Sequence, residues 1–283
     1  MEQQSFFNYN GKLFLENEKT VSVNDRSFRY GEGCFETMKM QNGKILLQDY
    51  HLERLNNSLQ RMRFVKIDFF NSVKLIEQIQ QLAQKNKHAG LARIRLTVSR
   101  GNGGLYEIPQ SPPNYSIQTW GLSESANRLN ENGLVIDVYK DAIKVADKFS
   151  SIKCNNYLSY AMAAVWVKEQ KLNDALLLNQ FGRITDATIA NVFIVKGNTI
   201  RTPALTEGCV HGVMRRFLIE QLKKSDLIVE ETKLSVADIE QADEIFFTNA
   251  IAGIKWISSF GSIHYTNKVA SDLFKKIIEP LLY

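Results

Sequence analysis

Apolar and polar residues follow two different periods along the chain, one typical of helices and one typical of strands. After Asp49, apolar residues recur every three or four positions, at Leu52, Leu55, Leu59 and Met62. This spacing predicts an amphipathic helix with Asp49 as its N-cap, and the same period predicts a second helix over residues 72–85. Residues 93–99 instead alternate strictly between polar and apolar, which predicts a half-buried strand.

The second half of the sequence continues this mixture of strands and helices. Short apolar runs predict strands over residues 134–138, 175–178, 192–195, 199–201 and 244–248. Helical spacing of apolar residues predicts helices over residues 157–170 and 213–224. Gly197-Asn198 between two strands indicates a hairpin, and Ser235 with Asp238 resembles a capping box at a helix start. The pattern therefore predicts an α/β protein with mixed sheets.

A polar stretch rich in turn-forming residues divides the sequence into two α/β halves. Residues 121–133 (GLSESANRLNENG) have the composition of a linker. The length of 283 residues also fits two domains of the usual size, ~150 residues each. We therefore expect a smaller N-terminal domain over residues 1–120, a linker over 121–133 and a larger C-terminal domain over 134–283.

The composition narrows the class of protein further. Hydrophobic residues make up 44% of the chain and charged residues 23%, as in soluble globular proteins. No apolar run approaches the ~20 residues that a membrane helix needs. The start of the sequence, Met1 to Gln4, lacks the basic-then-apolar layout of a secretory signal. These features predict a cytoplasmic protein without a membrane partner.

The distribution of charged residues, cysteines and histidines argues against a nucleic-acid-binding protein and against a protein built on a metal site or on disulfides. The net charge of +5 is spread along the chain, whereas a nucleic-acid-binding protein concentrates its positive charge. The three cysteines form no CxxC pair, and the four histidines lack the spacing of metal ligands. We therefore expect small anionic substrates, no nucleic acid, no metal and no disulfide framework, and any cofactor is expected to be organic.

Several motifs carry possible chemistry, although each has a plain alternative when taken alone. Gly101-Asn102-Gly103-Gly104 lacks the residues of a phosphate-binding P-loop and reads better as a turn. Arg54 lies within the Asp49 helix, and Lys153 lies between a predicted strand and a predicted helix. A solvated surface side chain is the default for both residues.

The order and spacing of these residues favour a functional role over the default interpretation as surface side chains. Lys153 is followed 33 residues later by Asp186, then by Gly212-Val213-Met214-Arg215 at a helix start and by Thr248-Asn249-Ala250 at a strand end. This series resembles the class IV aminotransferase family, the fold-type IV pyridoxal-phosphate enzymes, from about Asn24 to Trp256. The resemblance implies a two-domain enzyme of the D-amino-acid aminotransferase type that binds pyridoxal 5'-phosphate and forms a homodimer.

The resemblance also assigns site residues. Lys153, in the C-terminal domain, would form the Schiff base with the cofactor and then move the α-proton of the substrate. Arg54 would bind the cofactor phosphate through its fork of donors, together with backbone amides at a helix N-terminus. The cofactor contacts that the resemblance implies, besides Lys153, are Arg54, Asn156, Asp186, Val213, Met214, Asn249 and Ala250.

Asp186 departs from the family pattern. The family ordinarily has glutamate at this position, paired with the pyridine nitrogen so that the ring withdraws electrons. Aspartate has the same charge on a side chain one methylene shorter. A turn aspartate is one alternative, and a cofactor-binding protein that has lost its catalytic activity is another.

Local features favour one subgroup of the family, the aminodeoxychorismate lyases. Phe35 stands where D-amino-acid aminotransferases typically have tyrosine, and Thr37 matches a threonine that relays a proton to the departing pyruvate unit. The Lys153-to-Asn156 spacing is also that of the lyase and D-amino-acid enzymes. Arg95 and Arg100 are candidates for binding a substrate carboxylate. Threonine is common in strands whatever their function, so an aminotransferase acting on branched-chain or D-amino acids stays open as the alternative.

Overall fold

The computed structural model describes residues 4–107, 110–225 and 227–282, so three of the four residues at the start of the sequence, Met1 to Gln3, lie outside the described residues. The chain divides into two compact units. Unit 1 comprises Met1–Glu124 and Ile152–Asn156, and unit 2 comprises Ser125–Ser151 and Tyr157–Tyr283. Each unit is an α/β structure with a mixed arrangement of helices and strands, which confirms the predicted fold class.

This division differs from the predicted domain boundaries in two places. Most of the expected linker belongs to unit 2, because Asn130 exchanges hydrogen bonds with the backbone of Trp256. The segment Ile152–Asn156, which includes Lys153, belongs to unit 1 and not to the C-terminal unit. A short segment belongs to the sheet with which its backbone forms hydrogen bonds. The sequence of the segment alone does not determine which sheet that is.

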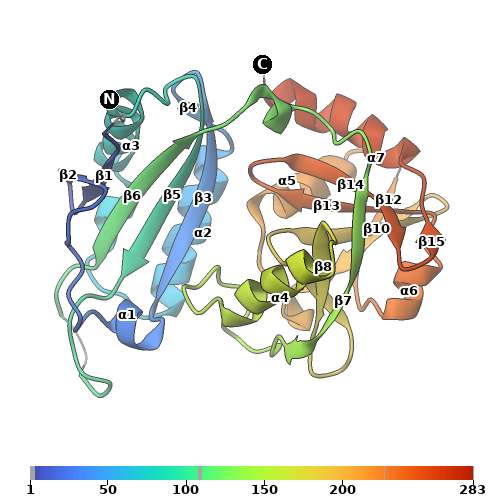
Figure 1. The fold of residues 1–283 in the computed structure, drawn as a ribbon, viewed down its shortest axis with the longest axis horizontal. Coiled ribbons are helices and arrows are strands. Elements are labelled where there is room, and N and C mark those ends of the chain that lie inside the picture. The colour runs from blue at the N-terminus through green and yellow to red at the C-terminus, as the bar shows by residue number, and fades with distance from the viewer. Residues whose placement is uncertain (1–3, 108–109, 226, 283) are drawn as a thin grey trace. The chain divides into compact units, whose positions relative to one another are not determined.

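Unit 1 is built on a six-stranded antiparallel sheet with two long helices on one face (Figure 1). The strand order is β2-β1-β6-β5-β3-β4. The strands are β1 (Phe6–Tyr9), β2 (Lys12–Leu15), β3 (Gly33–Gln41), β4 (Lys44–Ile45), β5 (Leu91–Ser99) and β6 (Asn114–Gly121). The helices are α1 (Arg26–Tyr30), α2 (Gln48–Arg61) and α3 (Val73–Lys85). The apolar faces of α2 and α3 pack on the sheet and form one hydrophobic core with it.

Strand β3 presents different chemistry on its two faces, because side chains alternate along a strand. Cys34, Met38 and Met40 point into the core beneath α2. Phe35 and Thr37 therefore lie on the opposite face, where the register pairs them with Thr97 and Arg95 of β5.

Unit 2 contains a nine-stranded mixed sheet. The strand order is β12-β11-β10-β13-β14-β7-β8-β9, with β15 paired to β14. The pairs β11–β12, β14–β7 and β7–β8 are parallel, and the other pairs are antiparallel. The strands are β7 (Leu134–Ile143), β8 (Asp174–Leu178), β9 (Ile184–Ala187), β10 (Asn191–Lys196), β11 (Thr199–Pro203), β12 (Ile228–Thr232), β13 (Glu244–Asn249), β14 (Gly253–Phe260) and β15 (Ile263–His264).

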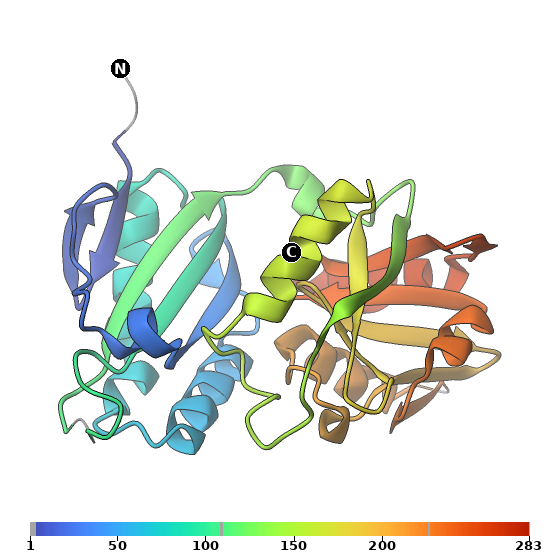
Figure 2. The same ribbon diagram turned by 60° about the horizontal axis from the view of Figure 1, so that its bottom comes forward.

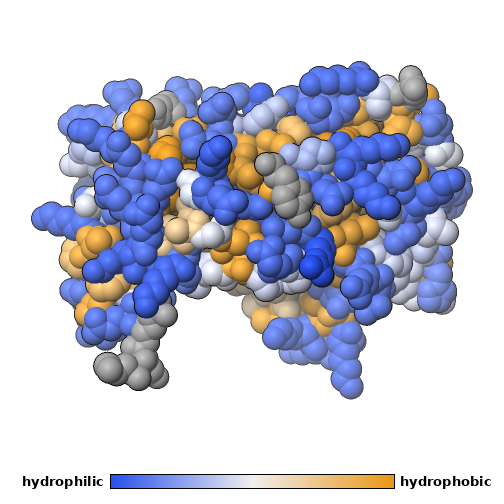
Figure 3. Space-filling view, turned by 90° about the horizontal axis from the view of Figure 1, so that it is seen from above, coloured by the Kyte–Doolittle hydropathy of each residue, from blue (hydrophilic) through white to orange (hydrophobic). Residues whose placement is uncertain are grey.

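Four helices accompany this sheet. They are α4 (Leu158–Glu169), α5 (Val213–Leu222), α6 (Val236–Glu240) and α7 (Lys268–Leu273). Helix α4 packs on β7 and β8 (Figures 1 and 2), and α6 begins with the predicted capping box of Ser235 and Asp238. Among the described residues, no helix combines the length and apolar character that a membrane crossing requires. On the face drawn in Figure 3, hydrophilic residues form most of the surface and apolar residues occur in small groups.

One predicted helix start is wrong. Asp49 lies in the first turn of α2, and the N-cap is Leu47, which has a left-handed backbone (φ 54°) and no side-chain capping bond. The tight connection from β4 imposes this conformation, so tertiary structure overrides the local capping preference. Asp49 still lies near the positive end of the helix dipole.

Candidate active site

In unit 1, Lys153 lies against the face of β3 that carries Phe35. The Nζ atom of Lys153 is 4.5 Å from the centre of the Phe35 ring, and the Cζ atom of Arg95 is 3.8 Å from the same centre. Thr37 is paired with Arg95 across the two strands. The structure therefore brings together four predicted site residues, Lys153, Phe35, Thr37 and Arg95, on one face of the sheet.

The backbone around Lys153 is fixed by hydrogen bonds to β3. The amide of Phe35 donates to the carbonyl of Lys153, and the amide of Asn155 donates to the carbonyl of Gly33, both at 2.9 Å. Asn155 also has a buried Oδ1 atom with no hydrogen-bond partner among the described residues. The side chain of Asn156, the last residue of the segment, is exposed.

On the other face of β3, a buried triad contains Arg54 and two residues that sequence reasoning missed. Arg54 donates from Nε to Glu36 Oε1 at 2.8 Å and from Nη2 to Glu36 Oε2 at 2.5 Å. His51 Nδ1 lies 2.6 Å from Glu36 Oε2. His51 and Arg54 are three residues apart on α2, a spacing that puts both on one helix face and that was a usable signal. The predicted phosphate-binding arginine is therefore held in place by a buried carboxylate.

The protonation states of this triad follow from its contacts. Burial raises the pKa of Glu36, but the charge of Arg54 and the hydrogen bond from His51 outweigh it and lower the pKa to about 2. Burial lowers the pKa of His51, and the positive charges of Arg54 and Lys153 act in the same direction. A neutral His51 that donates from Nδ1 presents Nε2 as an acceptor, and this atom is buried with no partner among the described residues.

Among the described residues, Arg100 has three hydrogen bonds within unit 1. Its Nε donates to Glu32 Oε1 at 2.5 Å, its Nη1 donates to the carbonyl of Arg63 at 2.9 Å and its Nη2 donates to the carbonyl of Met62. These bonds tie the end of β5 to the residues that follow α2. They use three of the five N–H donors of a guanidinium, so Arg100 and Arg95 both remain candidates for binding a substrate carboxylate.

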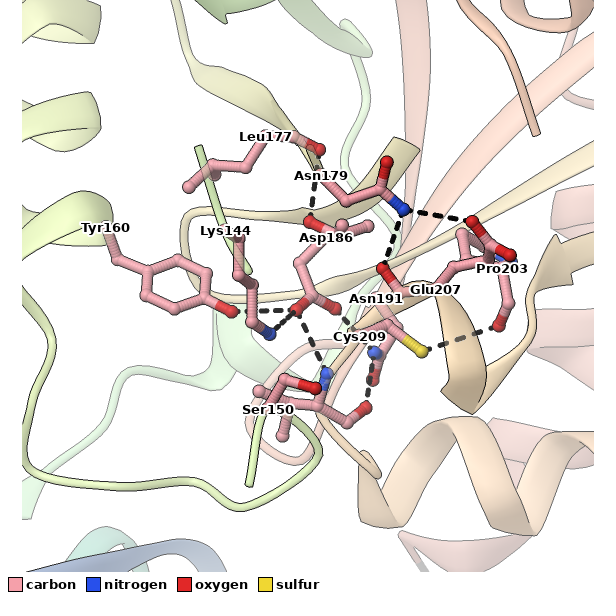
Figure 4. A network of polar contacts seen from close by, with 12 residues as sticks. Lys144, Ser150, Tyr160, Leu177, Asn179, Asp186, Asn191, Pro203, Glu207 and Cys209 are labelled. Carbon is pink, nitrogen blue, oxygen red and sulfur yellow. Dashed lines mark hydrogen bonds and ion pairs between the residues drawn. The ribbon is translucent and has the colours of Figure 1, made fainter. Parts of the chain in front are cut away.

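In unit 2, a polar network surrounds Asp186 (Figure 4). Asp186 is 2% exposed. Its Oδ2 atom accepts from Lys144 Nζ at 2.7 Å, from the Tyr160 hydroxyl at 2.8 Å and from the Val210 amide at 3.0 Å. Its Oδ1 atom accepts from Asn191 Nδ2 at 2.8 Å. These donors account for about the full acceptor capacity of a carboxylate.

Sequence reasoning missed Lys144, Tyr160 and Asn191, which come from three separate parts of the chain: the residue after β7, helix α4 and strand β10. Tyr160 is three residues into α4 and Asn191 begins β10, positions that showed no pattern in the sequence. Lys144 is 42 residues from Asp186. The shorter side chain of Asp186 is thus held by a buried ammonium and three neutral donors, and a plain turn aspartate does not have such surroundings.

The start of α5 lies next to this network. A Cβ atom on Gly212, the N-cap of α5, would lie 1.9 Å from Asn191 Oδ1, so the close approach requires glycine. Val213 and Met214 form the first turn, and no side chain caps it. The first amides of a helix have no partner within the helix and point outward, which favours an anion at this end.

The end of β13 borders the same place. Thr248 is paired with Asn191 across β10 and β13, and its buried Oγ1 has no hydrogen-bond partner among the described residues. Asn249 Oδ1 accepts from the amides of Ile251 and Ala252 at 3.0 and 2.8 Å, which shapes a tight loop that contains Ala250. Unit 2 therefore gathers Asp186, Val213, Met214, Asn249 and Ala250, the predicted set for a phosphate and a ring nitrogen.

Comparison with known proteins identifies the family. The sequence model of the family described as amino-transferase class IV matches residues 33–260. The chain belongs to this family. Its members depend on pyridoxal 5'-phosphate, so the protein is a pyridoxal-phosphate-dependent enzyme. Among the described residues, no side chain caps the start of α5 and the buried Thr248 hydroxyl has no hydrogen-bond partner, and both features fit an anionic phosphate at this end of the helix. Asp186 already accepts four hydrogen bonds, so a pairing with the cofactor ring would require one of these donors to give way.

The similar proteins are named either as aminodeoxychorismate lyases or as aminotransferases. The chain is 28% identical over 244 residues to the aminodeoxychorismate lyase of Vibrio harveyi, covering 86% of this chain and 88% of that protein. It is also 28% identical to a putative branched-chain-amino-acid aminotransferase of Methanocaldococcus jannaschii, covering 95% and 93%. The crystal structure of a putative 4-amino-4-deoxychorismate lyase from Legionella pneumophila is 27% identical, has a TM-score of 0.83 and covers 94% of this chain and 97% of that one.

Proposed function

We propose that the protein is a 4-amino-4-deoxychorismate lyase, which releases 4-aminobenzoate and pyruvate. The names of the Vibrio and Legionella relatives support this choice. The observation that carries it is the position of Thr37. This hydroxyl lies on the same face of β3 as Phe35, whose ring contacts Lys153. A lyase needs a second proton-transfer group near its lysine, and an aminotransferase does not.

Lys153 is the proposed group that moves the proton at the reacting carbon. When bound, pyridoxal phosphate holds the substrate amine covalently and withdraws electrons from the adjacent carbon. The Lys153 amine then removes the proton from that amine-bearing carbon, and Thr37 relays a proton to the departing pyruvate unit. Arg95, stacked on Phe35, is the proposed contact for a substrate carboxylate.

The remaining predicted residues bind and orient the cofactor in this proposal. Arg54 contacts the phosphate, and Glu36 keeps its guanidinium in one orientation through the paired bonds. In unit 2, the amides of Val213 and Met214 and the Asn249–Ala250 loop are the proposed contacts for a phosphate. Asn156, whose side chain is exposed, is a further proposed cofactor contact. We also propose that the protein is a homodimer and that it is cytoplasmic. A measurement of its mass in solution tests whether it is a homodimer.

An assay of the cofactor-loaded protein with 4-amino-4-deoxychorismate tests the proposal. The expected result is catalytic release of 4-aminobenzoate and pyruvate in equal amounts. The Thr37→Val variant keeps the strand and the side-chain volume but removes the hydroxyl. It is expected to lose about 10²-fold in turnover, the lower end of the range for a proton-transfer group. Thr199→Val, which changes a half-buried strand threonine of β11 in unit 2, is the matched control. An equal loss in both variants would contradict the role of Thr37.

The alternative activity is transamination of branched-chain or D-amino acids. The similarity to the Methanocaldococcus aminotransferase favours it. In that reaction Lys153 would again be the residue that moves the proton, and Thr37 would have only a packing role. Absence of lyase product, together with keto-acid formation from an amino acid, would establish this alternative.

The pairing of Asp186 with the cofactor ring has a separate test that needs no substrate. Lys144→Met leaves the buried Asp186 without its cation, which should lower the stability of the cofactor-free protein by about 3–5 kcal/mol. If the ring nitrogen pairs with Asp186, it takes over part of the role of the missing ammonium. Pyridoxal phosphate should then raise the melting temperature more in this variant than in the unaltered protein.

The comparison variant is Asp186→Asn, in which the carboxylate charge is absent. Pyridoxal phosphate should raise its melting temperature least of the three proteins. The same rise in Lys144→Met and in the unaltered protein would contradict a pairing between Asp186 and the ring. It would favour the alternative of a cofactor-binding protein without catalytic activity.

A further inference from the structure

Two of the three cysteines lie directly opposite each other in unit 1, although 120 residues separate them (154 − 34 = 120). Cys34 of β3 and Cys154 form an antiparallel β-bridge. Two backbone hydrogen bonds flank this bridge, from the Phe35 amide to the Lys153 carbonyl and from the Asn155 amide to the Gly33 carbonyl. Cys34 and Cys154 are therefore a non-hydrogen-bonded pair, in which opposed Cα atoms are about 4.5 Å apart.

Both thiols also point in the same direction. Cys34 is part of the hydrophobic core of unit 1, and Cys154 packs against the same core. Burial raises the pKa of the Cys34 thiol, and the charges of Glu36 and of the nearby Cys154 act in the same direction. A disulfide requires Cα atoms about 4.4–6.8 Å apart and Cβ atoms that face each other. The typical separation of a non-hydrogen-bonded pair lies within this range, and the two side chains share one face, so a disulfide is geometrically accessible to these two free cysteines.

We propose that Cys34 and Cys154 are a redox-responsive thiol pair that closes into an intramolecular disulfide and thereby lowers the reactivity of Lys153. Cysteine spacing along the sequence does not predict such a pair, because the two cysteines belong to distant segments. The third cysteine, Cys209, lies in unit 2 and is fully buried.

The order of reaction follows from exposure. Cys154 is partly exposed, whereas Cys34 is 2% exposed. The Cys154 thiolate attacks a small-molecule disulfide such as oxidised glutathione, forming a mixed disulfide and releasing one glutathione thiolate. Cys34 then loses its proton to water and attacks the Cys154 sulfur, which expels the second glutathione thiolate. Two protein thiols are oxidised, and one molecule of oxidised glutathione is reduced to two of glutathione.

Closure of this disulfide would act on Lys153 through the backbone. Opposed Cβ atoms in strands lie about 4.5–5.5 Å apart, whereas disulfide-bonded Cβ atoms lie about 3.8 Å apart. Oxidation would therefore draw β3 and the Lys153 segment together by about 1 Å, at residues adjacent to Phe35 and Lys153. A displacement of about 1 Å in a reacting group can cost 10²-fold in rate. This step rests on the proposed role of Lys153.

The test treats the full-length, cofactor-loaded protein with oxidised glutathione and measures intact mass, linked peptides and turnover. We expect a product lighter by two hydrogen atoms, with the peptides of Cys34 and Cys154 linked and no glutathione retained. Dithiothreitol should restore the original mass. Turnover of the oxidised protein, on whichever substrate it accepts, should fall at least tenfold and recover on reduction.

Two variants make the result specific. Cys34→Ala removes the second thiol, so glutathione should remain attached to Cys154. Cys209→Ser is the matched control and should form the linked peptides as the unaltered protein does. A persistent glutathione adduct on the unaltered protein, absence of any linked peptide, or full turnover in the linked protein would overturn the proposal. The mass measurement needs no substrate, so a negative lyase assay would leave this result unaffected.

Discussion

Replacing Lys153 by alanine is expected to lower turnover by about 10⁴-fold or more, the upper end of the range for a single proton-transfer group. The reason is that the proposed reaction gives this amine two tasks, covalent attachment of the cofactor and movement of the proton at the reacting carbon. The fold should be unaffected, because the Lys153 backbone carbonyl, and not its side chain, accepts the hydrogen bond from β3. Steady-state kinetics and the melting temperature, measured on the same preparation, check both parts.

The matched control for this variant is Lys148→Ala. The Nζ atom of Lys148 lies 4.9 Å from the centre of the Phe149 ring, so this lysine also contacts an aromatic side chain, but it is exposed. Its replacement should leave turnover within about twofold, since exposed substitutions usually have small effects. If Lys153→Ala retains turnover, Lys153 is not the lysine that binds the cofactor. This conclusion would hold under both the lyase and the aminotransferase hypotheses.

The elements that sequence periodicity predicted well are those that local contacts determine. Helix α3 begins one residue after the predicted start and ends where expected, because Ser72 is its N-cap and its apolar spacing is regular. The capping box of Ser235 and Asp238 also forms as predicted. Local hydrogen bonds and spacing contain enough information for such features.

The features that sequence reasoning missed depend on contacts between distant segments. The pairing of residues 152–156 with β3 moved Lys153 into unit 1 and placed Cys154 opposite Cys34. Arguments from cysteine spacing excluded a disulfide framework, but they do not address two thiols that separate strands bring together. The partners of Asp186 were missed for the same reason, since a buried carboxylate can draw its donors from any element of the fold.

The resemblance to the family identified Arg54 and left out the carboxylate that holds it. Glu36 is 2% exposed and lies one residue after Phe35, so alternation along β3 puts it on the buried face. A buried glutamate needs a partner, and the arginine and histidine three residues apart on α2 were the available candidates. This inference requires knowledge of which face of the sheet is buried. Glu36 was therefore identified as the partner of Arg54 only from the structure.

Glu36→Ala is accordingly expected to lower the free energy of unfolding by about 3–5 kcal/mol, because it leaves the Arg54 guanidinium buried without a counter-charge. Chemical denaturation measures this change. Glu230→Ala is the control, since the Arg201–Glu230 pair is exposed and worth less than about 1 kcal/mol. In the double variant Glu36→Leu/Arg54→Met both charges are absent, so much of the lost stability should return. A loss in Glu36→Ala no larger than in the control would show that the buried pair does not stabilise the fold.

The same triad gives the unaltered protein a defined response to acid. The pKa of Glu36 is lowered from 4.5 to about 2 in the folded state, so its contribution to stability is complete above about pH 4.5 and is lost as the pH falls toward 2. The lowered pKa of His51 adds a loss in the same direction, because an unfolded histidine gains its proton first. The double variant Glu36→Gln/His51→Asn removes both titrating groups, because Glu36 also raises the pKa of His51 and a single change would leave the histidine's contribution larger. The unfolding free energy of this double variant should depend less steeply on pH between 5 and 3 than that of the unaltered protein, and equal slopes would contradict the lowered pKa values of the triad.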